Sequence, residues 1–209
     1  MKLVTLVSIF LGINIIVSPV VASEANPQPQ PVIEKNSSQE QTIVNPEVIL
    51  RNAITAVTGQ LKNGGKPEQL LAFFNKEIAP YFDFNYMARL AASYHWNSLD
   101  DKQQNDFVTL FQNNFFQALV GKISNLGSPN IQFYPARPGS NHNEVTVSAQ
   151  VIQPQGMPVL MDFRFYRSDN GWKVFDVMAD GSSAVLYYRR FYAELANRYG
   201  ASALLGGSK

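Results

Sequence analysis

Few side chains in this sequence have the type and spacing that catalysis requires. Asp162 and Asp176 interrupt otherwise apolar, strand-like segments, and a carboxylate that faces an enclosed pocket could act as a general base. Asp162 alternates with Arg164, which favours an outward position and an ion pair between the two. Asp176 shares the alternation of Trp172 and Val174, so we expect it to be buried, in a structural hydrogen bond or as a base.

The histidines and the glycine pair do not form a metal or phosphate motif. His95 and His142 lack the spacing of any metal site, and His142 lies in a polar segment typical of a turn. Gly64-Gly65-Lys66 is followed by Pro67 and lacks the upstream glycine and the following Ser or Thr of a phosphate-binding loop. The sequence therefore predicts no catalytic residue, no metal and no cofactor.

The N-terminus predicts export. Lys2 precedes a predominantly apolar segment from Leu3 to Ile16, and small residues follow up to Ala22. The apolar segment is short for a bilayer span of about 20 residues, so we interpret residues 1–22 as a signal peptide and not as a membrane anchor. Residue 23 is Ser and not the Cys of a lipoprotein, so the mature protein is expected to be free in its compartment.

Composition narrows the classes of protein that fit. The chain has no cysteine, so an exported domain must be stable without disulfides. Once Lys2 is removed with the signal peptide, 16 basic and 16 acidic residues remain, and this balance predicts no long-range attraction to nucleic acid. Residues 23–45 are rich in Pro and Gln and predict a disordered leader. Residues 46–205 have the size of one domain, and residues 206–209 are expected to be a flexible tail.

Hydrophobic spacing predicts helices first and strands afterwards. Helices are predicted over residues 46–61, 67–80, 83–94 and from Ser98 past Leu119, with Asn45, Asp83 and Ser98 as N-caps. Beyond Gly127 the period changes to two. This alternation predicts four strands, and their approximate bounds are 131–133, 145–151, 159–165 and 172–177.

Two turn signals complete the predicted fold. Asn170-Gly171 is a two-residue hairpin signal between the last two strands, and a final helix begins at Ser182 or Ser183 and ends at Gly200. The prediction is an α+β fold in which N-terminal helices pack on one face of a curled four-stranded antiparallel sheet. A C-terminal helix would close this domain, which would have an NTF2-like, cone-type shape.

The aromatic content is high, with 14 Phe, 9 Tyr and 2 Trp. These residues concentrate on the predicted long helix and on the last two strands, where an apolar stripe ordinarily forms a core. The same side chains could instead line a cavity. From its residues alone, the chain is an exported α+β domain whose apolar face either fills a core or encloses a ligand.

Several strings of residues occur in an order and spacing that are similar to those of a known family. The strings are Pro80-Tyr81-Phe82-Asp83-Phe84-Asn85-Tyr86-Met87-Ala88-Arg89, Trp96 with Asp101-Lys102-Gln103-Gln104, Trp172-Lys173-Val174-Phe175-Asp176-Val177, and Asp180-Gly181-Ser182-Ser183 with Tyr188-Arg189-Arg190-Phe191. Over nearly all of residues 46–205 the chain resembles the MlaC family, also called the toluene-tolerance family of auxiliary transport proteins. It departs from the family at Ser93, where Gly is usual, and at Ser182, where an apolar residue is usual.

This resemblance implies a soluble periplasmic carrier that shuttles phospholipid between an outer-membrane lipoprotein complex and an inner-membrane ABC transporter with a substrate-binding ring. The carrier would help to maintain the lipid asymmetry of the outer membrane. Exposing acyl chains to water costs about 0.8 kcal/mol per methylene, so such a carrier needs a pocket that sheathes the tails. It would be a monomer and would need no catalytic group.

In this interpretation the lipid tails lie between the apolar face of the sheet and the helices, and the headgroup stays near solvent. Strand alternation and the helical stripe predict the pocket residues Phe111, Phe115, Leu119, Val147, Val151, Met161, Phe163, Phe165, Val174 and Val185. Each of them could instead belong to a solid core. Arg189 and Arg190 could meet a lipid phosphate or an acidic partner, or form an ordinary solvated face.

Other functions fit the same sequence. The cargo could be another apolar lipid, such as a hopanoid. A small cone-fold enzyme could use the buried Asp176 as its general base. An adaptor with a solid core would bind partner proteins and no lipid.

Overall fold

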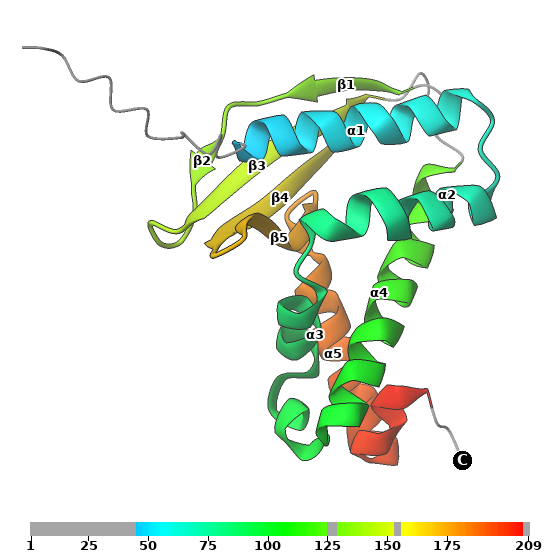
Figure 1. Cartoon of the computed structure of the whole chain (residues 1–209), viewed down its shortest axis with the longest axis vertical. Helices are drawn as coiled ribbons and strands as arrows, with labels where there is room; N and C mark the ends of the chain where they lie inside the picture. Colours follow the sequence, from blue (N-terminus) through cyan, green and yellow to red (C-terminus); the bar gives the residue numbers. More distant parts are fainter. Residues whose placement is uncertain (1–44, 125–128, 153–155, 207–209) are drawn as a thin grey trace, which may run out of the picture. The chain divides into compact units, whose positions relative to one another are not determined.

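The computed structural model describes residues 45–124, 129–152 and 156–206 (Figure 1). The predicted signal peptide (1–22), nearly all of the predicted leader (23–45) and most of the predicted tail (206–209) lie outside these residues. The described α-helices are α1 (Pro46–Lys62), α2 (Pro67–Phe73), α3 (Phe84–Ala92), α4 (Asp101–Ile123) and α5 (Ala184–Tyr199). The described strands are β1 (Asn130–Phe133), β2 (Arg137–Pro138), β3 (Glu144–Ile152), β4 (Val159–Ser168), β5 (Gly171–Ala179) and β6 (Ser182–Ser183).

Side-chain caps begin most of these helices where the sequence predicts. Asn45 accepts a hydrogen bond from the backbone N–H of Glu47 (2.9 Å), and Asp83 accepts one from Tyr86 (2.8 Å). Ser183 caps α5 by accepting a hydrogen bond from the N–H of Leu186 (3.1 Å). The predicted cap of α4 was wrong, because a 3₁₀ segment, Ser93–Ser98, occupies that part of the chain.

The cap of α4 lies two residues later than predicted. Asp100 accepts a hydrogen bond from the N–H of Gln103 (2.8 Å), and the Gln103 side chain accepts one from the N–H of Asp100 (2.9 Å). Ser98 instead donates its hydroxyl to the carbonyl of His95 (2.7 Å). The helix predicted over 67–80 is likewise α-helical only to Phe73, and a π-turn and a 3₁₀ turn continue it to Tyr81.

The sheet has six strands in the described part of the chain, two more than predicted. Its order is β1-β3-β4-β5-β6, and β2 pairs with β3 on the same edge as β1. Every pair of adjacent strands in the described part of the chain is antiparallel, as expected. The missed strands, β2 and β6, have two residues each, and a segment that short shows no alternation that sequence analysis could detect.

A β-bulge decides which side chains of β5 share a face. Arg164 pairs with Asp176, but the next residue, Phe165, pairs with Val174, so Phe175 is an extra residue on β5. Val174 therefore lies on the face of Phe165, whereas Asp176 lies on the opposite face with Arg164. The predicted shared alternation of Asp176 and Val174 was wrong for this reason, although the predicted burial of Asp176 is confirmed.

The hairpin between β4 and β5 is present, but its turn lies one residue earlier than predicted. Ser168 pairs with Gly171, so the two loop residues are Asp169 and Asn170. Gly171 adopts a φ of 99°, which glycine reaches without a steric penalty. The glycine is thus required at the first residue of β5 and not inside the loop.

The two faces of the sheet differ in composition. One, the apolar face, carries Val145, Val147, Ala149 and Val151 of β3 opposite Phe165, Phe163, Met161 and Val159 of β4. The other, the polar face, carries Ser148 opposite Asp162 and Thr146 opposite Arg164. A single strand register therefore separates apolar from charged side chains completely over these pairs.

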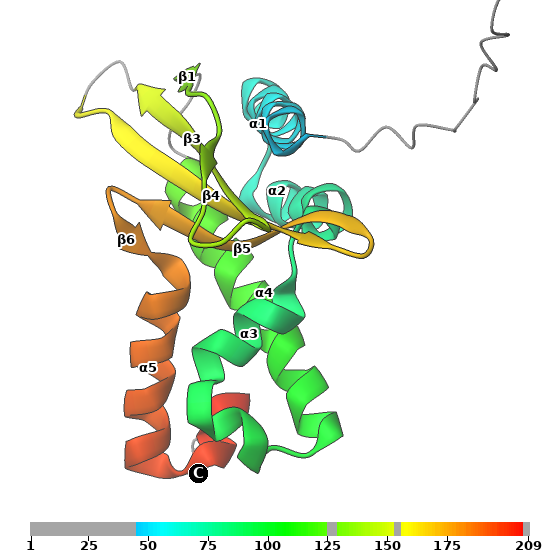
Figure 2. The same ribbon diagram turned by 90° about the vertical axis from the view of Figure 1, so that its left-hand side faces the viewer.

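Helix α1 covers the apolar face and is attached near its N-terminus. The Glu47 carboxylate accepts a hydrogen bond from the N–H of Ala136 (2.6 Å), and the Arg51 guanidinium lies 4.3 Å from the ring centroid of Phe133. Figures 1 and 2 both show α1 alongside the strands, with α3, α4 and α5 below the sheet. The α1 stripe thus faces the apolar face.

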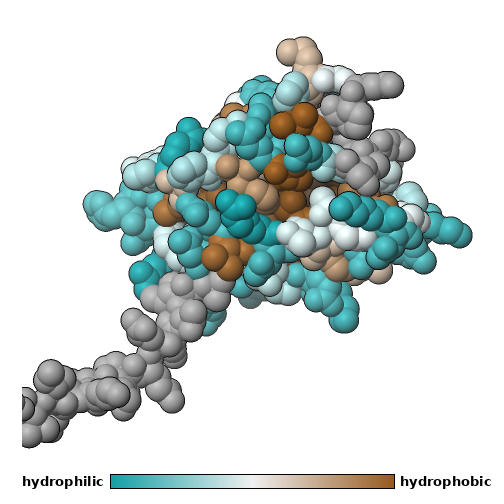
Figure 3. Space-filling view, turned by 90° about the horizontal axis from the view of Figure 1, so that it is seen from above, coloured by the Kyte–Doolittle hydropathy of each residue, from teal (hydrophilic) through white to brown (hydrophobic). Residues whose placement is uncertain are grey.

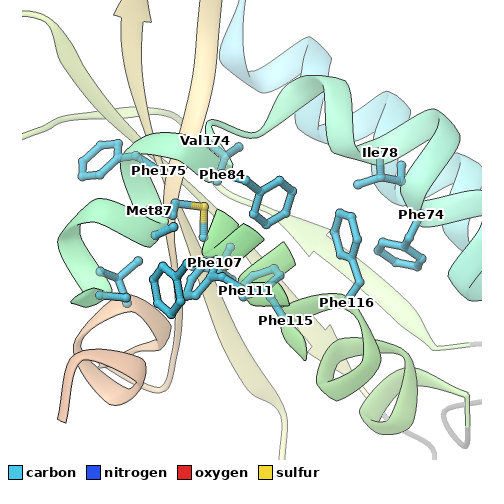
Figure 4. Close-up of a cluster of buried hydrophobic side chains, with 14 of the residues drawn as sticks. Phe74, Ile78, Phe84, Met87, Phe107, Phe111, Phe115, Phe116, Val174 and Phe175 are labelled. Atoms are coloured by element: carbon cyan, nitrogen blue, oxygen red, sulfur yellow. The ribbon is translucent and has the colours of Figure 1, made fainter. Parts of the chain in front are cut away.

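Aromatic rings connect the lower helices. Phe107 of α4 lies 4.8 Å from Tyr192 of α5, and Phe84 of α3 lies 5.0 Å from Phe116 of α4, measured between ring centroids. Figure 4 shows Phe84, Phe115 and Phe116 gathered between these helices.

Helices pack on both faces of the sheet, and not on one face alone as the sequence predicted. Tyr86 of α3 packs on Tyr166 of the polar face, with 5.6 Å between their ring centroids. The cone-type shape remains a prediction.

Ser93 holds a backbone conformation that suits glycine. Its φ of 54° with ψ of −130° brings Cβ close to the backbone, which costs about 1–3 kcal/mol in a residue other than glycine. We predict that Ser93→Gly raises the free energy of unfolding by about 1 kcal/mol, after the larger chain entropy of glycine is subtracted. Urea denaturation measures this change. Ser93→Ala is the matched control, and an equal gain from Ala would contradict the explanation.

Candidate functional site

The apolar stripe of α1 is fully buried only near the N-terminus of the helix. Ile49 and Leu50 are 7% and 3% exposed, close to the attachment points at Glu47 and Arg51. The same stripe continues through Ile54, Val57 and Leu61, which pack against the core but stay partly exposed. The C-terminal half of α1 therefore presents apolar side chains that the domain does not bury fully.

The apolar face of the sheet shows the same gradient. Val147, Ala149 and Phe165 are buried, whereas Met161 and Phe163 are only partly buried. The partly exposed apolar side chains on both sides define what we call the apolar seam: Ile54, Val57 and Leu61 of α1, and Ile131, Val151, Met161 and Phe163 of the sheet. Seen from above, hydrophobic residues reach the surface between hydrophilic borders (Figure 3). A surface of this kind is typical of a binding site for an apolar ligand.

The predicted pocket residues divide between the buried core and the partly exposed surface. Six of them are buried: Phe111, Phe115, Val147, Phe165, Val174 and Val185. Four are partly exposed: Leu119, Val151, Met161 and Phe163. The pocket list stays a prediction, and the latter group is the one that a ligand could reach without displacing core side chains.

The buried members belong to different parts of the domain. Phe111 and Phe115 stack with ring centroids 6.3 Å apart in the aromatic cluster below the sheet (Figure 4). Val185 stands at the start of α5, where its N–H is bonded to Asp176. Ile54, Val57 and Leu61 were not among the predicted site residues, although their spacing predicts the helix. Helical spacing marks the inward face but not where that face is left open.

Comparison with known proteins identifies the family. A sequence model described as MlaC protein matches residues 36–206. The chain belongs to the MlaC family. Among solved structures, it is similar to a phospholipid-binding protein from Ralstonia solanacearum that was determined in complex with a phospholipid. The identity is 24%, the TM-score is 0.68, and the match covers 76% of this chain and 91% of that one, which establishes a shared fold. No curated protein matches the chain.

In this MlaC-family chain, Asp176 is a structural carboxylate. It is 3% exposed, and its oxygens accept hydrogen bonds from the Ser183 hydroxyl (2.7 Å) and the N–H of Val185 (3.1 Å). The Arg164 guanidinium lies 3.6 Å away. Both oxygens are therefore engaged at the start of α5, which is the structural role that the sequence left open.

Asp162 and Arg164 do not pair with each other, contrary to the prediction. Arg137 of β2 lies 3.1 Å from Asp162, which also accepts the hydroxyl of Ser148, whereas Arg164 lies 3.6 Å from both Asp176 and Glu144. The short strand β2, which sequence analysis missed, supplies the closer partner. Residues two apart on one strand share a face, but their charged groups pair more readily with the adjacent strands.

The two histidines lie on separate elements. His95 belongs to the 3₁₀ segment Ser93–Ser98, and its buried Nε2 has no hydrogen-bond partner within the described part of the chain. Its ring lies 3.8 Å from that of Tyr94 between centroids. His142 is exposed in the turn between β2 and β3.

In residues 45–124, 129–152 and 156–206 no helix is long and apolar enough to cross a bilayer.

A second concave region, which we call the polar cleft, lies over the polar face. It has a volume of about 790 Å³ and is bounded by α3, the 3₁₀ segment, the β2–β3 turn and the end of β4. Its lining residues are Asp83, Asn85, Tyr86, Arg89, Trp96, Gln104, Asn141, His142, Asn143, Glu144, Tyr166 and Arg167. Burial, and then a hydrogen bond to Asp83, raise the pKa of Tyr166 to about 12. Tyr166 is therefore a neutral hydrogen-bond donor at physiological pH.

We predict that Asp176→Asn lowers the free energy of unfolding by about 2 kcal/mol, because the substitution removes a buried charge from Arg164 and a hydrogen-bond acceptor from Ser183. Urea denaturation measures the loss. Asp169→Asn is the matched control, because Asp169 is exposed in the hairpin turn and its substitution should cost less than about 0.5 kcal/mol. Equal stability of the two variants would contradict the structural role of Asp176.

Proposed function

We propose that this protein is a lipid carrier that shelters the acyl chains of a phospholipid in the apolar seam. The observation that carries the proposal is that the apolar stripe of α1 is buried only at its N-terminal end. Its N-terminal residues Ile49 and Leu50 are buried, its C-terminal half is partly exposed, and Met161 and Phe163 of the apolar face are partly exposed as well. The similar structure from Ralstonia solanacearum, a phospholipid-binding protein in complex with a phospholipid, supports the same cargo.

Transfer energies explain why the seam suits lipid tails. Each methylene withdrawn from water contributes about 0.8 kcal/mol, so a long acyl chain is held without any charged contact. A bound lipid tail would also remove the partly exposed apolar side chains of the seam from water, and this burial contributes favourable free energy to binding. A carrier of this kind uses binding alone and requires no catalytic residue.

Family membership and the N-terminal sequence support a more detailed proposal. The protein is exported by residues 1–22 and acts in the periplasm. There it carries phospholipid between two membrane-bound partners, which are an outer-membrane lipoprotein complex and an inner-membrane ABC transporter with a substrate-binding ring. This traffic would maintain the lipid asymmetry of the outer membrane. A monomer suffices for the task, because the seam is formed within one chain.

Native mass spectrometry of the mature protein, purified from the periplasm without detergent, tests the proposal. We expect a mass that exceeds the protein mass by one or more phospholipids, and lipid extraction would then identify the headgroup. A hopanoid in the extract would keep the carrier and change its cargo. A clean protein mass that persists after incubation with phospholipid vesicles would refute lipid carriage.

A charge placed in the apolar seam should expel the lipid. Val57 faces the sheet and is partly buried, whereas the next residue towards the N-terminus, Ala56, is exposed on the outer side of α1. We predict that Val57→Glu reduces the bound lipid at least about tenfold, because a buried carboxylate has no partner there. Ala56→Glu, which adds the same charge to the same helix, should retain the lipid content of the unmodified protein. Equal lipid content in both variants would place the cargo elsewhere.

A further inference from the structure

The polar cleft has features that lipid carriage does not use. Its lining includes Glu144 and Tyr166 of the polar face, and Phe165, the neighbour of Tyr166 in β4, points to the apolar face. Because α1 covers the apolar face, the polar cleft and the apolar seam lie on opposite sides of the sheet. A ligand in one site would not touch the other.

The acids of the polar cleft are already engaged by the protein. Asp83 accepts hydrogen bonds from the N–H of Tyr86 (2.8 Å) and from the hydroxyl of Tyr166. Glu144 accepts hydrogen bonds from the side-chain amide of Asn141 (2.8 Å) and the N–H of Ser140 (3.2 Å). Each carboxylate oxygen of these two acids therefore already accepts one hydrogen bond from the protein.

The cations of the polar cleft are not engaged. Arg89 and Arg167 are exposed, and their guanidinium groups form neither an ion pair nor a hydrogen bond with any residue that the structure describes. With His142 neutral, the formal charges of the lining residues cancel, two acids against two arginines. The use of their polar groups differs, because each acid oxygen already accepts a hydrogen bond from the protein, whereas the two guanidinium groups, with five donors each, bond to no described residue. The cleft is thus suited to a ligand that brings carboxylate or phosphate oxygens.

Aromatic side chains narrow the chemistry of that ligand. Tyr86, which is 39% exposed, and Trp96 line the same cleft. Tyr, Trp and Arg are the residues most enriched at the energetic centres of protein interfaces. A cleft of about 790 Å³ is much larger than a phosphate ion, and a flat bilayer surface does not enter a concavity bounded by a turn and a helix.

We propose that the polar cleft is a docking site for an acidic polypeptide segment of a partner protein, with Arg89 and Arg167 binding its carboxylates and Tyr86 and Trp96 packing on its apolar atoms. Docking would then use one face of the sheet while cargo occupies the other. The proposal does not depend on the identity of the cargo, and it concerns a site separate from the apolar seam.

Fluorescence anisotropy with labelled hexaglutamate as the probe tests this site in the mature protein at low salt. We expect Arg89→Gln/Arg167→Gln to weaken binding at least about fivefold, and hexaserine to bind no variant. The matched control is Arg189→Gln/Arg190→Gln, which removes the same charge from exposed positions on α5 and should change the affinity less than about twofold. Equal weakening in both double variants would overturn the proposal, because it would show attraction by net charge alone.

Three further measurements separate the alternative ligands and the alternative causes. Amide chemical-shift changes on adding hexaglutamate should concentrate at residues 85–89 and 141–144, and changes confined to α5 would overturn the proposal. Competition by equimolar inorganic phosphate would indicate a small-anion site, and binding to phosphatidylglycerol vesicles that requires Arg89 and Arg167 would indicate a membrane contact; either result would also overturn it. Native mass spectrometry of Arg89→Gln/Arg167→Gln should show unchanged lipid, so failure of docking and failure of carriage are distinguishable.

Discussion

The buried carboxylate of Asp176 connects the sheet to the C-terminal helix, and much of the domain depends on that connection. The bulge at Phe175 turns Asp176 to the polar face, where Arg164 neutralises it and the start of α5 donates two hydrogen bonds. Without the bulge, Asp176 would face the apolar side, and Val177 would not oppose Phe163. One extra residue thus lets four successive residues of β5, 174–177, be buried on two different faces.

The position of α5 in turn decides how the lower helices pack. Tyr188 and Tyr192 of α5 contact Phe111 and Phe107 of α4, and burial raises the pKa of both tyrosines, so they remain neutral core residues at physiological pH. Phe107, Phe111 and Tyr192 of this cluster are buried. Above this cluster, the apolar side chains of α1 are buried near its attachment at Glu47 and partly exposed beyond it, at Ile54, Val57 and Leu61.

Much of the fold could be predicted from local patterns. The helical spacing of α1, the caps Asn45, Asp83 and Ser183, and the alternation of β3 and β4 depend on neighbouring residues alone, and the structure confirms them. Several of the failures depend on partners that are remote in sequence. Strand β2 and the Arg137–Asp162 ion pair exist only because β3 lies beside β2, and the face of Asp176 depends on pairing with β4.

The features of the candidate site likewise fall into those that local patterns predict and those that depend on the tertiary structure. The sequence by itself determined that the protein has an apolar sheet face, an amphipathic first helix and no recognised catalytic motif, since periodicity and residue type carry that information. It also carried the strings that place the chain in the MlaC family. Only the tertiary structure decided that the stripe of α1 is buried at Leu50 and partly exposed at Val57. Likewise, only the tertiary structure brought Arg89 and Arg167 to one cleft. Burial and the convergence of side chains depend on how the elements are placed relative to one another, which no local pattern specifies.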